Sequence, residues 1–166
     1  MPLFGSKEKL KGLINFSKHN PLLKNLTNKE INELEMITHL REYKDGEIII
    51  QSKEPGLAIY IIKKGNAYVV LGSVGGKGEI LEKIEEGEVF GEMSLFENEP
   101  RSVHVIADGD AQILGIFKHD FDALIHRNKK LGFKLLYNIA ILLSSKLRRA
   151  NVKLYKKLSD HESTLA

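Results

Sequence analysis

The stretch LAIYIIKKGNAYVVLG, residues 57–72, consists of two runs rich in β-branched and aromatic residues, separated by a glycine. Such runs are typical of β-strands. Five more runs of the same kind lie around it: EIIIQ (47–51), EILEKI (79–84), EGEVFGE (86–92), SVHVIA (102–107) and AQILGIF (111–117). Seven runs at a spacing of roughly ten residues predict an antiparallel jelly-roll barrel. The glycine-rich SVGGKGE (73–79) suits a hairpin tip, because it lacks the Gly-Lys-Ser/Thr and the following helix of a phosphate loop.

Helical spacing appears on both sides of these runs. TNKE (27–30) has the form of a capping box, and the apolar residues after it predict a helix over 28–39. After residue 118 the helical period returns, first in KHDFDALIHRN (118–128) and then in a long helix over about 130–158. The long helix has an apolar stripe: Ile139, Leu143, Leu147, Ala150, Leu154 and Leu158. The predicted fold is mainly β with flanking helices.

Three parts are therefore expected along the chain. Residues 1–26 form a helical lead-in, residues 27–128 the β-roll domain, and residues 129–166 a basic C-terminal helix. With 166 residues the chain has room for one ordinary domain and a short appendage. It contains no cysteine, no secretory leader and no apolar stretch long enough to cross a bilayer, so we expect a cytoplasmic protein without a transmembrane segment.

The charge is unevenly distributed. The chain has 25 basic and 22 acidic residues, but nine of the basic ones and no acid lie within residues 129–157. A basic run of this kind is most often the solvated face of a helix, and here it flanks an apolar stripe that suits a dimer seam. The same run would also suit an acidic partner protein, an anionic membrane surface or nucleic acid.

Most of the candidate ligand-binding residues lie in one stretch, EVFGEMSLFENEPRSVHVIA, residues 88–107. A short helix beginning at Gly91 and Glu92 directs unpaired N–H groups toward an anion, and the Arg101 guanidinium with the Ser102 hydroxyl suits phosphate oxygens. The Glu92 carboxylate would repel a phosphate unless it accepts a hydrogen bond from a ligand hydroxyl. A ribose that carries both a phosphate and a free hydroxyl meets these requirements.

The stretch FGEMSLFENEPRSVHV (90–105) resembles the phosphate-binding cassette of the cyclic nucleotide-binding domain family, and the similarity extends over about residues 13–158. The resemblance implies that cAMP or cGMP is the ligand. Glu92 would accept from the ribose 2′-hydroxyl and Arg101 would pair with the cyclic phosphate. The implied remainder of the site is Gly91, Met93, Ser94, Ser102 and Val103 around the phosphate, Val69, Leu81 and Ile84 beside the base and sugar, and residues 146–151 as a lid over the base.

Two positions depart from the family. Val103 stands where alanine is usual, and His104 where serine or threonine is frequent. Val103 either crowds the phosphate or faces the core. A simpler interpretation of the two charged residues also exists, in which Glu92 is an ordinary acid at a helix N-terminus and Arg101 is its salt-bridge partner.

We therefore expect a stand-alone cyclic nucleotide sensor that signals by moving its C-terminal helix, forms a homodimer through that helix or meets an unknown protein target, and is not an enzyme. The sequence offers no nucleophile with a paired base and no metal-ligand spacing. The chain ends at Ala166 without a helix-turn-helix, so sequence-specific DNA binding is not expected. The alternatives are a nucleotide-free module whose basic helix docks an acidic partner, and non-specific binding of nucleic acid by that helix.

Overall fold

The computed structural model describes residues 20–73 and 78–165. The strands form a six-stranded sheet with the order β1-β6-β3-β4, in which β2 pairs with β6 and β5 pairs with β3, all antiparallel. The strands are β1 (Thr38–Tyr43), β2 (Ile48–Ile50), β3 (Ala58–Leu71), β4 (Glu79–Ile84), β5 (Val89–Phe90) and β6 (His104–Phe117). The helical segments are η2 (Pro21–Leu23), α2 (Asn28–Glu35), η3 (Glu92–Leu95), α3 (Lys118–Arg127) and α4 (Lys129–Leu165).

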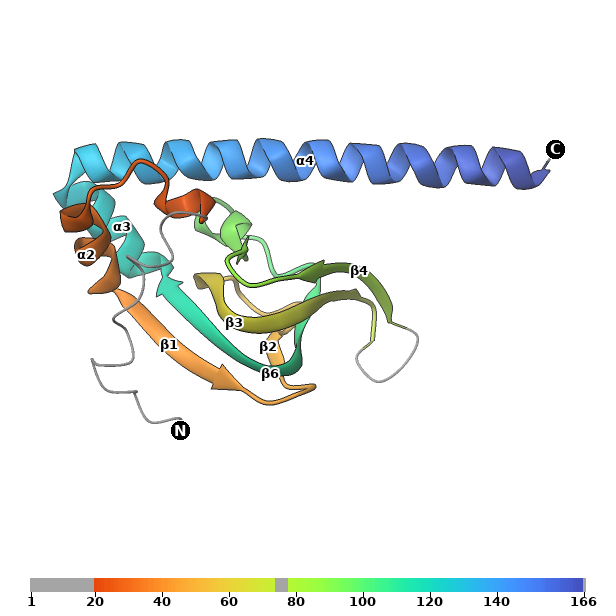
Figure 1. Cartoon of the computed structure of the whole chain (residues 1–166), viewed down its shortest axis with the longest axis horizontal. Helices are drawn as coiled ribbons and strands as arrows, with labels where there is room; N and C mark the ends of the chain where they lie inside the picture. The colour runs from red at the N-terminus through yellow and green to blue at the C-terminus, as the bar shows by residue number, and fades with distance from the viewer. Residues whose placement is uncertain (1–19, 74–77, 166) are drawn as a thin grey trace.

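The two long strands β3 and β6 hold the sheet together. Each has 14 residues and curves across the molecule (Figure 1). One half of β6 pairs with β1 and the other half with β2, while β3 pairs with β5 near its start and with β4 near its end. This arrangement confirms the jelly-roll prediction, although the pairings among the described strands leave the barrel open.

The prediction of seven separate strands was wrong, because β3 and β6 each join two of the predicted runs. Gly65 lies inside β3 with a φ of +86°, and a Cβ there would be 2.6 Å from the Asp110 carbonyl oxygen. The register of β3 against β6 shifts on either side of Lys64. Glycine therefore lets β3 bend sharply beside β6, where the sequence suggested that the strand ends.

The capping box before α2 is confirmed. The Glu30 amide donates to the Thr27 hydroxyl, and the Thr27 amide donates to the Glu30 carboxylate at 2.8 Å. The helix ends at Glu35, earlier than predicted, because Thr38 begins β1 and pairs with Ile116. Residue 39 is therefore a strand residue and not a helical one.

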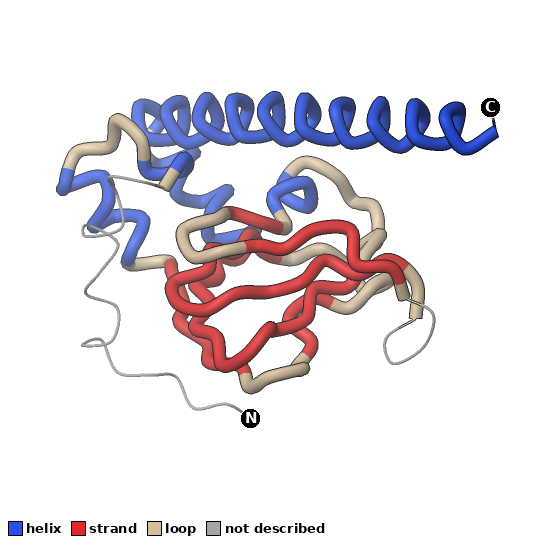
Figure 2. Tube along the Cα trace, turned by 45° about the vertical axis from the view of Figure 1, so that its right-hand side comes forward, coloured by secondary structure: helices blue, strands red, loops and turns tan. Residues whose placement is uncertain are grey.

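Two apolar cores lie on opposite sides of the sheet. One lies inside the roll and contains Ile62, Phe90 and Val105. The other lies between the sheet and the helical segments and contains Leu22 and Phe121. Figure 2 shows the helices gathered along one side of the strands. The core inside the roll adjoins the cavity described below.

The long helix α4 packs on the body with its first part and extends past the body with its second (Figure 1). Leu131, Leu135 and Ile139 are buried, and the Asn138 side-chain amide donates to the backbone carbonyls of residues 22 and 24. Leu147 and the later leucines of the predicted stripe are exposed. Within the described part of the chain, no helix is both long enough and apolar enough to span a membrane.

Lys134 anchors this first part of α4 to α2. Its ammonium lies 2.7 Å from the Glu30 carboxylate. Burial alone would raise the pKa of Glu30, but Lys134 and the Thr27 hydrogen bonds outweigh it and hold that pKa below its usual value. Of the predicted lead-in, residues 1–19 lie outside the described residues and residues 21–23 form one 3-10 turn. The tip of the β3–β4 hairpin, residues 74–77, also lies outside them.

Candidate functional site

Gly91 turns the chain from β5 into η3. It caps η3 with a φ of +73°, a conformation that favours glycine. A Cβ at this position would lie 2.9 Å from Arg101 Nη1 and 3.1 Å from Tyr60 Cδ2. Among the described residues no side chain caps the helix at Gly91. The cassette therefore begins with the turn that the sequence predicted, as a single 3-10 turn.

Arg101 lies in the loop just before β6, and its guanidinium is turned toward the backbone of the cassette. Nη1 donates to the Gly91 carbonyl at 3.1 Å and Nη2 donates to the Ala58 carbonyl at 2.7 Å. A guanidinium has five N–H groups, so these bonds fix its position without using all its donors. Burial lowers the pKa of Arg101, while Tyr60 and Glu92 oppose that shift. The usual pKa is so high that the group stays charged.

The segment between β2 and β3, residues 51–57, holds the backbone of Arg101. The Arg101 amide donates to the Glu54 carbonyl at 2.9 Å, and the Arg101 carbonyl accepts from the Lys53 amide at 2.8 Å. The Ser52 hydroxyl donates to the same carbonyl. Gly56 packs so closely that a Cβ there would be 2.2 Å from Ser94 Cβ. This segment thereby sets the position from which the guanidinium reaches the cavity.

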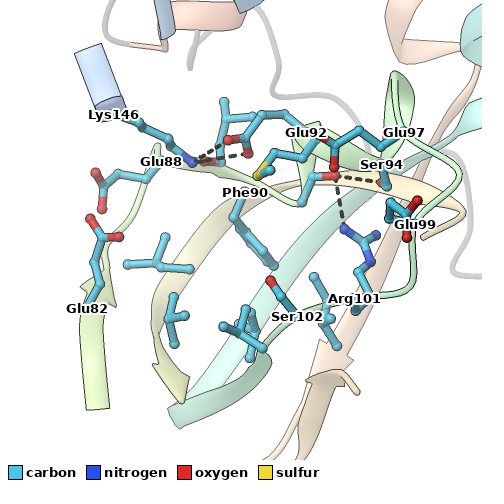
Figure 3. Close-up of a pocket in the computed structure, with 18 of the residues that line it drawn as sticks. Glu82, Glu88, Phe90, Glu92, Ser94, Glu97, Glu99, Arg101, Ser102 and Lys146 are labelled. Atoms are coloured by element: carbon cyan, nitrogen blue, oxygen red, sulfur yellow. Dashed lines mark hydrogen bonds and ion pairs between the residues drawn. The ribbon is translucent and has the colours of Figure 1, made fainter. Parts of the chain in front are cut away.

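Glu92 is the first residue of η3 and only 4% exposed. Its carboxylate pairs with Lys146 of α4, whose Nζ lies 3.0 Å from Oε1 (Figure 3). No ion pair joins Glu92 to Arg101 among the described residues. The simpler interpretation of these two residues as partners across a loop is therefore wrong, since each has a different partner.

A cavity of about 260 Å³ opens beside these groups. It brings together nine of the ten predicted ligand residues: Gly91, Glu92, Met93, Ser94, Arg101, Ser102, Val103, Val69 and Ile84. Figure 3 shows the Glu92 carboxylate directed from η3 toward Lys146, and the Arg101 guanidinium directed from the loop before β6 toward the cassette backbone near Ser94. Ser94 was expected around the phosphate, and its hydroxyl donates to the Gly91 carbonyl at 2.8 Å.

One predicted residue lies elsewhere. Leu81 faces a second groove between β4 and α4 and does not line the cavity. Its prediction as a cavity residue was wrong because β4 alternates its side chains, so that Glu82 and Ile84 line the cavity in its place. Val103 lines the cavity, while the ring of His104 accepts a hydrogen bond from the Ser52 amide at 3.2 Å.

Sequence reasoning missed the acids around the cavity: Glu82, Glu88, Glu97 and Glu99. It also missed that the basic helix forms ion pairs with the body of the same chain. At least four basic residues of α4 face acids of the body, through the pairs Lys134–Glu30, Lys146–Glu92, Arg149–Glu88 and Lys157–Glu79. Outside residues 129–157 the chain has 16 basic and 22 acidic residues, and this acidic excess, which complements the basic helix, was a signal for this docking. Lys146 and Arg149 fall within the predicted lid and line the cavity.

Comparison with known proteins agrees with this geometry. The model of the cyclic nucleotide-binding domain family matches residues 40–128, which include β2 to α3 and the whole cassette. The chain belongs to this family. Members of the family share the fold described above, in which the cassette connects β5 to β6.

Several relatives show how widely the domain is used. The cyclic AMP receptor protein of Thermus thermophilus is 31% identical over 82% of this chain and 62% of its own length. Human cGMP-dependent protein kinase 2 is 28% identical over 87% of this chain and 20% of its own. The crystal structure of a cyclic nucleotide-binding domain from Methylobacillus flagellatus superposes with a TM-score of 0.81 at 20% identity, covering 93% of this chain and 87% of that one. The chain thus spans less than two thirds of the curated relatives described here.

Proposed function

We propose that this chain is a regulatory protein that binds a cyclic mononucleotide, cAMP or cGMP, in the cavity beside η3. The observation that carries the proposal is the pair of opposite charges, Glu92 and Arg101, that line one cavity. The Arg101 guanidinium suits the cyclic phosphate, and the buried Glu92 carboxylate suits the ribose 2′-hydroxyl. The Ser102 hydroxyl and the amides at the start of η3 complete the phosphate site. The cavity of about 260 Å³ lies just below the range of about 300 to 1,000 Å³ that is usual for small-molecule sites, so we expect a ligand no larger than one nucleotide.

The proposal extends to signalling through α4. Lys146 and Arg149 bring α4 to the cavity, so a ligand can act on the helix directly. A ligand shifts the helix only if it binds more tightly in one position of α4 than in another. The pairing of α4 with the acids of the body also argues against the nucleotide-free docking module, because those basic side chains already have partners.

Titration calorimetry of the wild-type chain tests the binding proposal. We expect saturable binding of cAMP or cGMP, with weaker binding of the 2′-deoxy analogue, because that analogue cannot donate to Glu92. One charge-assisted hydrogen bond contributes about 1.5 to 3 kcal/mol, so the analogue should lose roughly 10- to 150-fold in affinity. No heat with either cyclic nucleotide would refute the proposal and favour the docking module.

We further propose that the partner of α4 is a second copy of this chain. Eight of its exposed residues lie at a heptad spacing: Phe133, Tyr137, Ala140, Ser144, Leu147, Asn151, Leu154 and Leu158. Apolar residues at such positions pack in parallel coiled coils, and a single asparagine among them fixes the register.

Replacing Leu147 and Leu154 together with glutamate should convert the dimer to a monomer, because four carboxylates would be buried in the seam. Light scattering after gel filtration measures the mass. Val152→Glu is the matched control, since Val152 is exposed on the same helix but lies outside the heptad positions. A wild-type chain with the mass of a monomer would refute the dimer.

A further inference from the structure

The contact between Lys146 and Glu92 joins α4 to the cassette at one point. Lys146 Nζ lies 3.0 Å and 3.1 Å from the two Glu92 carboxylate oxygens and donates to the Val89 carbonyl at 2.8 Å (Figure 3). Of the three N–H donors of the ammonium group, one bonds Glu92 Oε2 and one bonds the Val89 carbonyl, and Oε1 completes the ion pair. Lys146 is therefore held against Glu92 and would act on a ligand through it.

The pair is largely buried, so the Glu92 carboxylate depends on this contact for its compensation. The Glu92 side chain is 5% exposed and that of Lys146 is 29% exposed. A carboxylate removed from water to this degree is strongly disfavoured unless it is paired and hydrogen-bonded. Lys146 supplies the pairing, and its own position is fixed by the Val89 carbonyl of β5.

The charges around the cavity are a second reason why Glu92 needs Lys146 as a partner. The lining has more acidic than basic side chains, and a cyclic nucleotide would bring one more negative charge. Without Lys146, the Glu92 carboxylate would face the phosphate with Arg101 to offset both, since the other cation of the lining, Arg149, pairs with Glu88. With Lys146 in place, Glu92 is neutralised and Arg101 remains for the phosphate.

The pair can persist when a ligand binds. Each carboxylate oxygen has two lone pairs, and the hydrogen bond from Lys146 uses one of those on Oε2. A ribose hydroxyl can therefore donate to Glu92 while the lysine stays in place.

We infer that Lys146 is the counter-ion that neutralises and orients Glu92 for the ribose hydroxyl, and that it thereby makes α4 part of the ligand-binding wall. The inference rests on the proposed function for its ligand. It makes docking of α4 and occupation of the cavity favour one another, and such coupling acts equally in both directions.

Calorimetry with the cyclic nucleotide that binds the wild type tests the effect on affinity. We expect Lys146→Met to weaken binding about tenfold, which is within the usual range for coupled sites. The same substitution in a Glu92→Gln background should change affinity less than about twofold, because the charge that it neutralises is gone. Lys156→Met, which removes an exposed charge elsewhere on α4, is the control and should bind as the wild type does.

Equal or tighter binding by Lys146→Met would overturn the inference, because the lysine would then be irrelevant or would compete with the ligand for Glu92. An equal loss in the Glu92→Gln background would also overturn it, since Lys146 would then act through something other than Glu92.

Hydrogen exchange of the α4 amides over residues 139–150 tests the contact without ligand. Lys146→Met and Glu92→Gln should each speed this exchange, and the double variant should add little to either. If the wild type binds no cyclic nucleotide, the proposed function fails. The hydrogen-exchange measurement then decides by itself whether the Lys146–Glu92 contact stabilises the docked position of α4. Exchange in Lys146→Met at the wild-type rate would overturn that role.

Discussion

Replacing Arg101 with alanine should lower the affinity for the cyclic nucleotide by at least about 100-fold. A guanidinium paired with a phosphate makes two charge-assisted hydrogen bonds, each contributing about 1.5 to 3 kcal/mol, and every 1.4 kcal/mol is a factor of ten. The other groups that we propose for the phosphate site, Ser102 and the amides at the start of η3, are uncharged. They cannot compensate for the lost charge.

The same substitution should also lower stability, because Arg101 has a structural role. Its removal leaves the carbonyls of Gly91 and Ala58 without the donors that they have now. An unsatisfied group of this kind costs about 1 to 3 kcal/mol when it is buried. Thermal unfolding should therefore accompany the calorimetry, so that loss of affinity is measured only at a temperature where the variant is folded.

Two further variants make the test of Arg101 specific. Arg101→Lys keeps the charge but loses the planar fork, so its affinity should fall between those of alanine and arginine. Arg41→Ala removes an arginine from β1, outside the cavity, and should bind as the wild type does. A folded Arg101→Ala variant with wild-type affinity would contradict the assigned role.

The cassette was predictable from sequence because its chemistry is local. Gly91, Glu92 and Arg101 lie within one stretch of 11 residues, and a glycine, an acid and an arginine at that spacing have few other uses. Their neighbours along the chain also define the turn that brings them to one cavity. The predicted residues of this segment accordingly line the cavity.

The contacts of the cassette with the rest of the chain were not predictable in the same way. Lys146 is 54 residues from Glu92, and nothing in a run of nine basic residues marks which one meets it. Leu81 was misplaced for a related reason, since the face of a strand depends on a register that only pairing with β3 fixes. Long-range packing decided both outcomes.

The role of Gly56 also depends on packing between segments far apart in the sequence. Gly56→Ala should destabilise the chain by about 1 to 3 kcal/mol. Its new Cβ would lie 2.2 Å from Ser94 Cβ and 3.2 Å from Arg101 Nε. Ser94 cannot easily yield, because its hydroxyl bonds the Gly91 and Ala58 carbonyls. Overpacking of this kind costs about 1 to 3 kcal/mol, which lowers the unfolding temperature by roughly 2 to 12 °C in a chain of this size.

The control for the glycine substitution is Gly115→Ala, whose Cβ would be 3.4 Å from Tyr60 Cε1, an ordinary contact. That variant should unfold close to the wild-type temperature. Gly56→Ala unfolding at the same temperature as this control would contradict the steric argument.

A compensating substitution identifies the clash itself. Ser94→Gly removes the Cβ that Gly56→Ala would meet, so the double variant should recover part of the lost stability. Gly56→Ala should also weaken binding, because it displaces the segment over residues 51–57, in which Lys53 and Glu54 hold the Arg101 backbone. The double variant should recover part of that affinity as the segment returns. Recovery of both properties together would show that the orientation of Arg101 depends on this segment. Recovery of stability without recovery of affinity would contradict this dependence and would mean that Ser94 itself contributes to ligand binding.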